Sequence, residues 1–157
     1  AGARRLVNST GNVVTRDGAG VDRDWLADAG TESTDPDVFG FCGGAALLRR
    51  EALDAVGGFD ADLFLYYEDT DVSWKLRAAG WTVRYVPDAV AEHRHAASSD
   101  TTSPLFRYYN ARNSLVVAWR HAPRTVVARA TVRQVLGLAR AVLRRSEPAP
   151  VLRARAR

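Results

Sequence analysis

The nine residues FLYYEDTDV, at positions 64–72, are the most informative stretch for the fold of this chain of 157 residues. They place three carboxylates within four positions, directly before an apolar-periodic segment that ends at Gly80. This pattern predicts a helix over residues 67–79, because acidic side chains near a helix N-terminus cap free N–H groups and complement the macrodipole. At 100° per residue, Asp69 lies on the apolar stripe that turns inward, and Asp71 lies about 200° away, on the outer side.

The acidic cluster has two interpretations. In the first, its carboxylates only cap and stabilise the start of the helix. In the second, Asp69 is a general base, because partial burial at the head of an apolar stripe raises the pKa of a carboxyl group toward the working pH. Among the three carboxylates, Asp69 is the one that we expect to carry such chemistry.

The remaining elements follow from hydrophobic periodicity and from glycine and proline positions. Their order predicts an α/β or α+β fold with few strands. A long, exposed loop is expected over residues 16–37, which are rich in Gly, Asp and Thr. The other expected elements are strands at 6–8, 12–15, 38–48, 81–86 and 90–95 and helices at 50–56, 104–121 and 123–145.

Charge is distributed unevenly along the chain. The net charge of +4 combines 10 basic and 17 acidic residues in positions 1–105 with 12 basic and 1 acidic residue in positions 106–157. This asymmetry predicts that the basic end meets an anionic surface or partner. The single Cys42 excludes an internal disulfide framework and a zinc site of several cysteines, and it fits a reducing cytosolic compartment.

The sequence carries neither a signal-peptide pattern nor about 18 consecutive uncharged apolar residues. It also contains no Met, so we expect the chain that starts at Ala1 to be part of a longer protein.

Several motifs in a fixed order resemble the second half of the family 2 inverting glycosyltransferases, and in particular its bacterial rhamnosyl- and galactofuranosyl-transferase-like members. The likeness covers roughly residues 5–120. The motifs are FCGGA at 41–45, GGFD at 57–60, FLYYEDTDV at 64–72, RAAGW at 77–81, VPDA at 86–89, His93 and RYYNARN at 107–113.

This resemblance implies the C-terminal portion of a nucleotide-sugar transferase of the GT-A type, with a mixed α/β sheet and flanking helices. Residues 1–121 are then the acceptor-side half of the catalytic domain, and residues 122–157 form a basic helical tail. The half that binds the nucleotide, with its metal-binding Asp-x-Asp, lies upstream of this sequence. The Asp-x-Asp patterns at 22–24, 35–37 and 60–62 are better explained as solvated turns.

The resemblance also implies roles for individual residues. Asp69, with Glu68 beside it, corresponds to the catalytic base that deprotonates an acceptor hydroxyl for one inverting displacement. His93 corresponds to a late ligand of a divalent cation, Mn²⁺ or Mg²⁺, although a surface histidine on a short strand is the alternative. Gly43 and Gly44 are expected to let a substrate approach the backbone, and strand packing is their alternative role.

Arg112 and Asn113 lie one helical turn beyond two tyrosines in RYYNARN. We expect them to line the cleft near the donor phosphates. For Arg112, a helix cap or an interhelical salt bridge is an equal alternative.

The basic tail is expected to be amphipathic. On a helical wheel Arg129, Arg133, Arg140 and Arg144 fall within about 60° of one another, and the apolar residues, Val132 and Leu136 among them, are assigned to the opposite side. This predicts a helix that lies on an anionic membrane surface, and the alternative is packing against the absent half. Nucleic acid is not expected as a partner, since no aromatic residue follows Trp119 to stack on bases.

Taken together, these features predict a glycosyltransferase that uses a nucleotide-sugar donor and builds a cell-envelope polysaccharide or modifies a lipid-linked acceptor. It would act in the cytoplasm, as a peripheral protein at the inner face of the plasma membrane. The alternative is a truncated, catalytically inactive module that binds a partner or a membrane through its Arg-rich helix.

Overall fold

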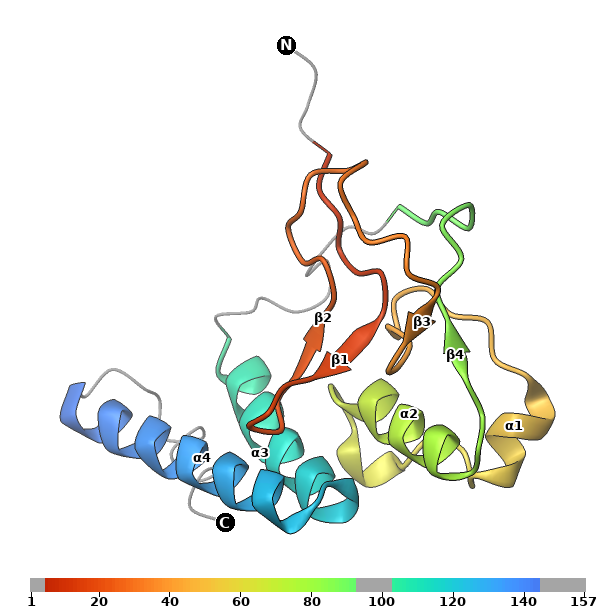
Figure 1. Ribbon diagram of the computed structural model, residues 1–157. Helices are drawn as coiled ribbons and strands as arrows, with labels where there is room; N and C mark the ends of the chain where they lie inside the picture. Colours follow the sequence, from red (N-terminus) through yellow and green to blue (C-terminus); the bar gives the residue numbers. More distant parts are fainter. Residues whose placement is uncertain (1–4, 93–102, 145–157) are drawn as a thin grey trace. The chain divides into compact units, whose positions relative to one another are not determined.

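The computed structural model describes residues 5–92 and 103–144 (Figure 1). These residues form two compact units with a mixed content of helices and small sheets. Unit 1 comprises residues 5–13, 20–59 and 69–92, and unit 2 comprises residues 14–19, 60–68 and 103–144. The predicted mixture of α and β structure is confirmed, whereas the domain boundary between residues 121 and 122 stays a prediction.

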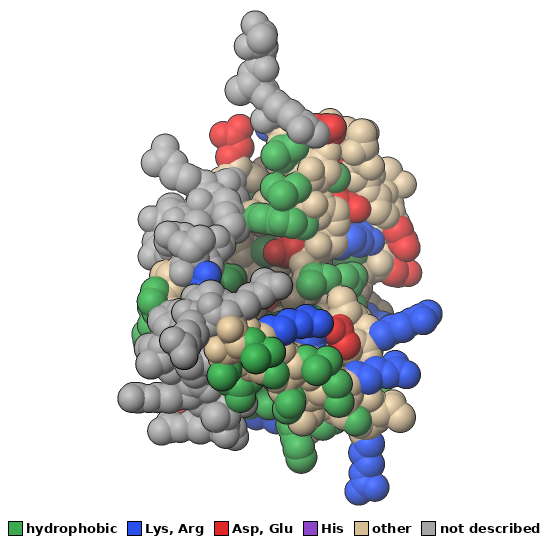
Figure 2. All heavy atoms as spheres, turned by 90° about the vertical axis from the view of Figure 1, so that its left-hand side faces the viewer, with side chains coloured by type: hydrophobic (Ala, Val, Ile, Leu, Met, Phe, Trp, Pro, Cys, Tyr) green, Lys and Arg blue, Asp and Glu red, His purple; other side chains and the backbone are tan. Residues whose placement is uncertain are grey.

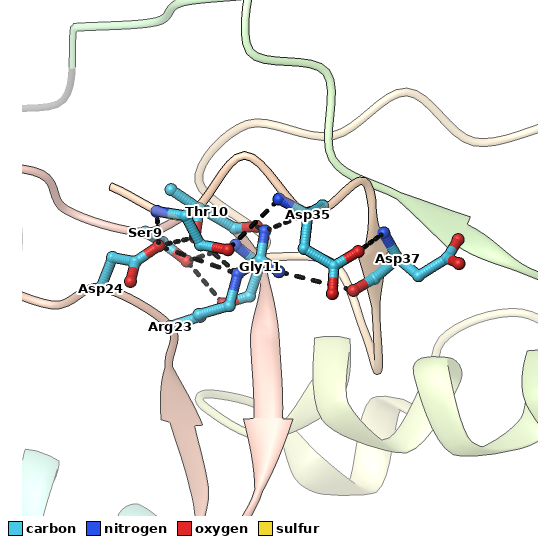
Figure 3. A network of polar contacts seen from close by, with 8 residues as sticks. Ser9, Thr10, Gly11, Arg23, Asp24, Asp35 and Asp37 are labelled. Carbon is cyan, nitrogen blue, oxygen red and sulfur yellow. Dashed lines mark hydrogen bonds and ion pairs between the residues drawn. The ribbon is translucent and has the colours of Figure 1, made fainter. Parts of the chain in front are cut away.

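The first sheet is a pair of short strands, β1 (Asn12–Val14) and β2 (Gly20–Asp22). Beside it, Arg23 donates from Nε to Oγ1 of Thr10 over 2.8 Å, and this hydroxyl donates to Oδ2 of Asp24 over 2.6 Å (Figure 3). The prediction of a long, exposed loop over all of residues 16–37 is therefore wrong at β2, because residues 20–22 pair with β1 and the Arg23 network orders this segment.

The second sheet joins β3 (Asp37–Val38) to β4 (Val83–Arg84) in antiparallel register. Both strands are much shorter than predicted. After β3, the backbone of Gly40 exchanges hydrogen bonds of 2.7 and 3.0 Å with that of Asn12, and the chain then turns at residues 43–45. No strand forms over residues 90–92, and the rest of the strand predicted there lies outside the described residues.

Two helices contribute to unit 1. α1 (Arg50–Ala55) ends at two glycines with positive φ, and the N–H of Gly58 donates to the carbonyl oxygen of Leu53 over 3.0 Å. α2 (Glu68–Ala78) follows the 3₁₀ turn η1 (Ala61–Leu63), and its residues from 69 onward belong to unit 1. The core of this unit is formed by Phe41, Ala52, Val72 and Leu76.

The buried face of α2 is wider than the apolar stripe. It includes Thr70, Asp71 and Ser73 besides the apolar side chains. The prediction that Asp71 points outward is wrong, because its carboxylate is fully buried and lies 2.6 Å from the ammonium of Lys75, one helical turn later. A cation at this spacing lets a charged side chain occupy the inward face.

Unit 2 is built around two long helices that pack side by side, α3 (Pro104–His121) and α4 (Arg124–Arg144) (Figure 1). Both were predicted to within about a residue, and both predictions are confirmed. Ser103 caps α3, since its Oγ accepts the N–H of Phe106 over 3.1 Å, and Pro104 occupies a position where no N–H is needed. Among residues 5–92 and 103–144, no helix combines the length and the apolar character that a membrane crossing requires.

The tip of the β1–β2 connection belongs to unit 2. Gly18 has a φ of +75°, and a Cβ there would lie 3.3 Å from both Cβ of Ala130 and Cγ1 of Val126. Beside it, the carboxylate of Asp17 lies 3.4 Å from Nε of Arg133. A hydrogen bond from Thr15 and the charge of Arg133 lower the pKa of Asp17. Glycine suits this tip, because a side chain here would meet both a positive φ and a close neighbour on α4.

Candidate active site

Asp69 is the second residue of α2, and its half-buried carboxylate is held by two backbone donors. Oδ2 accepts the N–H of Gly43 over 3.0 Å, and Oδ1 accepts the N–H of Thr70 over 2.6 Å. The structure thus brings together two of the predicted site residues, Asp69 and Gly43, which are 26 positions apart in the sequence. Glu68, the first residue of α2, is also half-buried.

The electrostatic environment raises the pKa of Asp69. Burial is the largest cause, because it disfavours the charged form. Hydrogen bonds from Gly43 and Thr70 lower the pKa part of the way, and the negative charge of Asp22 raises it again. A carboxylate with a raised pKa takes up a proton more readily than an ordinary one, which suits a general base.

The turn at residues 43–45 forms one wall beside this carboxylate. A Cβ at Gly43 would lie 3.6 Å from Oδ2 of Asp69, in ordinary van der Waals contact, and Gly43 and Gly44 are both exposed. The missing side chain therefore leaves room for a carbon atom next to this side of the carboxylate. Cys42, in the same turn, is half-buried, and burial raises the pKa of its thiol.

Arg112 and Asn113 lie in unit 2, on α3. The side chain of Asn113 is fully buried, and its Nδ2 donates to three backbone carbonyls of the segment that precedes α2. Arg112 donates from Nη1 to the carbonyl oxygen of Asp62 over 3.0 Å. Both side chains of α3 thus contact this segment, and their contact with a substrate stays a prediction.

The backbone path of that segment is not predictable from its residues. Three of its non-glycine residues, Phe64, Tyr66 and Tyr67, have positive φ angles. Positive φ angles are usually found at glycine, and this segment contains no glycine, so its composition does not predict them.

The described residues do not form a metal site. Within 5–92 and 103–144, no three His, Cys, Asp or Glu side chains are grouped to share an ion. In the Asp-x-Asp at 22–24, the carboxylate of Asp24 already accepts hydrogen bonds from Thr10 and from the N–H of Ser33. The predicted ligand His93 lies outside the described residues.

Comparison with known proteins identifies the class. The family model described as glycosyl transferase family group 2 matches residues 8–140, so the chain belongs to this family of glycosyltransferases. The resemblance predicted from the motifs is thereby confirmed, including its rhamnosyltransferase-like character.

Two kinds of curated relative support this assignment. The N-acetylglucosaminyl-diphospho-decaprenol L-rhamnosyltransferase of Mycobacterium tuberculosis is 38% identical over 82 residues, which cover 51% of this chain and 26% of the relative. The UDP-forming cellulose synthase catalytic subunit of Komagataeibacter sucrofermentans is 37% identical over 51 residues, or 32% of this chain and 6% of the relative. The match thus spans about a quarter of the rhamnosyltransferase. No solved structure matches the chain.

Proposed function

We propose that the chain is the acceptor-side, C-terminal portion of a GT-A type glycosyltransferase. It transfers a sugar from a nucleotide-sugar donor to a cell-envelope polysaccharide or a lipid-linked acceptor, with inversion. The observation that carries this proposal is the half-buried carboxylate of Asp69, fixed by the N–H of Gly43 and open on the side where Gly43 lacks a Cβ. The rhamnosyltransferase relative, whose name specifies a diphospho-decaprenol substrate, supports the lipid-linked acceptor.

In this mechanism Asp69 removes the proton from an acceptor hydroxyl as the hydroxyl oxygen attacks the anomeric carbon of the donor sugar. The bond from that carbon to the nucleotide diphosphate breaks, and its electron pair leaves with the diphosphate. One displacement inverts the anomeric configuration. The raised pKa of Asp69 makes the carboxylate a better proton acceptor, and the hydrogen bonds from Gly43 and Thr70 hold it in one orientation.

Glu68 is proposed to assist as the acidic neighbour of the base, and Gly43 and Gly44 to line the acceptor side. A divalent cation, Mn²⁺ or Mg²⁺, is the usual partner of this enzyme class, and His93 is the residue proposed to contact it. The described residues supply no site for the ion, and no step above depends on it.

The test replaces Asp69 by Asn in the complete polypeptide that its gene encodes. We expect sugar transfer to be lost while nucleotide-sugar binding, measured by calorimetry, is retained, and we expect the wild-type product to have the inverted anomeric configuration by NMR. Asp88→Asn, which removes an exposed carboxylate in unit 1, is the matched control and keeps its activity. Undiminished transfer by Asp69→Asn contradicts the proposal, and inactive wild-type protein favours the alternative of a non-catalytic module.

We further propose that α4 contacts an anionic membrane surface. The placement of its apolar side chains departs from prediction: Val132 and Leu136 line the same hollow as Arg129, Arg133 and Arg140 rather than the opposite side. The spacing explains this, because Leu136 is three residues after Arg133 and four before Arg140.

The exposed face of α4 carries large apolar side chains together with arginines. The buried residues of this helix are Ala130 and Gln134, and Gln134 donates to Oγ of Ser114 on α3 over 2.8 Å. Five of its larger apolar side chains are exposed, among them Val132 at 57% and Leu143 at 83%. Figure 2 shows hydrophobic and basic side chains next to one another on the surface of the molecule. Exposed apolar side chains beside arginines favour the boundary of an anionic leaflet.

Flotation of the full chain with phosphatidylglycerol vesicles at low salt tests this contact. We expect the wild type to float with these vesicles and not with phosphatidylcholine vesicles, and the combined change of Leu136→Ser and Arg140→Gln to abolish flotation. Arg84→Gln, an exposed arginine of unit 1, is the control. Equal flotation of all three proteins would exclude α4 as the contact, and binding would then have to involve another surface.

A further inference from the structure

The segment between η1 and α2 follows a strained backbone path. Phe64, Tyr66 and Tyr67 have φ angles of 59°, 66° and 70°. At Phe64, where ψ is −52°, the N–H of Leu65 donates to the carbonyl oxygen of Leu63 over 2.7 Å. This geometry is a γ-turn of the rare type with positive φ. Strained backbone persists only where the surroundings hold it, and it is concentrated at functional sites.

The carboxamide of Asn113 is the group that holds this path. Its Nδ2 lies 2.8 Å from the carbonyl oxygen of Leu63 and 2.9 Å from those of Leu65 and Tyr66. The two amide hydrogens therefore serve three acceptors of one turn, around a side chain that is fully buried. Without them, these carbonyl oxygens lose the donor that offsets their removal from water.

The orientation of the Asn113 amide is itself fixed. Its Oδ1 accepts a hydrogen bond of 2.7 Å from Nη1 of Arg112, and the same nitrogen donates to the carbonyl oxygen of Asp62 over 3.0 Å. Because the oxygen faces an arginine, the nitrogen must face the carbonyls of the turn. Adjacent residues of α3 thus bind consecutive parts of one segment.

The segment leads directly into the proposed base. Tyr67 is bonded to Glu68, the first residue of α2, and Asp69 follows. Glu68 belongs to the same compact unit as the turn and Asn113, so its position follows from the path of the turn that precedes it. We infer that Asn113 is a positioning residue that holds the 63–67 turn and thereby fixes the position of Glu68, the acidic residue next to the proposed base. Its catalytic consequence rests on the proposed function.

The test compares Asn113→Asp with Ser114→Ala in the complete polypeptide. The first substitution is nearly isosteric but replaces the two donor hydrogens by an acceptor. The second removes a neighbouring, equally buried side chain whose hydrogen bonds run to Ala111 and Gln134, not to the turn. Hydrogen exchange of the Phe64 and Leu65 amides reports the turn without any need for activity. Kinetics then separate kcat from the KM for the nucleotide sugar.

We expect Asn113→Asp to speed exchange at both amides at least tenfold and to lower kcat about 100-fold with little change in KM, because small misplacement of a group that assists the reaction, here Glu68, is costly. Ser114→Ala should leave both readouts near wild type. Equal behaviour of the two variants would show that Asn113 is merely structural. Faster exchange with unchanged kcat would remove the positioning role but leave the base assignment, which only an active Asp69→Asn would overturn.

A second variant guards against misfolding of Asn113→Asp. Phe64 is 71% exposed, and glycine at this position adopts positive φ without strain. Adding Phe64→Gly to Asn113→Asp should therefore slow exchange at Leu65 again and restore part of kcat. If the double variant exchanges as fast as Asn113→Asp and regains no activity, the turn is not what Asn113 holds.

Discussion

The buried ion pair of α2 gives the most direct test of the packing described above. Lys75→Met removes the ammonium that lies 2.6 Å from the fully buried Asp71 carboxylate. With an effective dielectric constant of about 20, Coulomb's law gives about 6 kcal/mol for unit charges at 2.6 Å. The lysine side chain is 24% exposed and partly solvated, so we expect the free energy of unfolding to fall by about 3 kcal/mol, the lower end for broken buried pairs.

Urea unfolding followed by the fluorescence of the four tryptophans measures this loss. Arg50→Met is a matched control, because it breaks an ion pair of the same helical spacing, with Asp54, that is exposed on both sides. The combined change of Asp71→Asn and Lys75→Met should recover most of the stability, since no buried charge is then left alone. If Lys75→Met and Arg50→Met shift the urea midpoint equally, Asp71 does not depend on this cation.

Three further predictions concern the Asp69 environment. Gly43→Ala should fold normally but lose transfer activity, because the added methyl group covers the open side of the carboxylate; Gly40→Ala, whose Cβ would lie 2.6 Å from Cβ of Ser73, should instead lower the melting temperature. Asp69→Asn should be more stable than wild type at pH 7 and equally stable at pH 3. A carboxyl group with a raised pKa destabilises the native state only when it is ionised, above the unfolded value of about 3.9. A gain in stability that persists at pH 3 would contradict this. The pH midpoint for alkylation of Cys42 should lie above that of an ordinary thiol, mainly because of burial. Asp69→Asn should lower this midpoint, because it removes a negative charge. An unchanged midpoint would show that the two side chains do not interact.

Local signals explain which elements were predictable. The start of α3 is specified by Ser103 and Pro104, and the end of α1 by Gly57 and Gly58, so these helices match their predicted ranges. Strands depend on partners that are distant in the sequence. β3 has only two residues, because only Asp37 and Val38 pair with β4. No local pattern at residues 38–48 indicates where this pairing stops.

In the candidate site, too, the residues with local signals were predictable and those that depend on distant partners were not. A helical wheel places Asp69 toward the inside of α2, where its side chain is half-buried, because its position relative to the apolar residues is a local property. The same wheel misplaced Asp71, whose burial depends on how broadly α2 is covered and on the Lys75 cation. The hydrogen bonds of Asn113 join residues about 50 positions apart and support positive φ angles without glycine, so neither spacing nor composition predicts them.

The two units are interleaved in the sequence, and this has a consequence for synthesis. Unit 2 draws on residues 14–19, 60–68 and 103–144, and unit 1 on residues 5–13, 20–59 and 69–92. During translation the turn at 63–67 therefore leaves the ribosome well before Asn113, the residue that stabilises it. Unit 1 can therefore be completed before α3 is made, whereas unit 2 cannot, and the 63–67 turn must wait for α3 before it takes its final form.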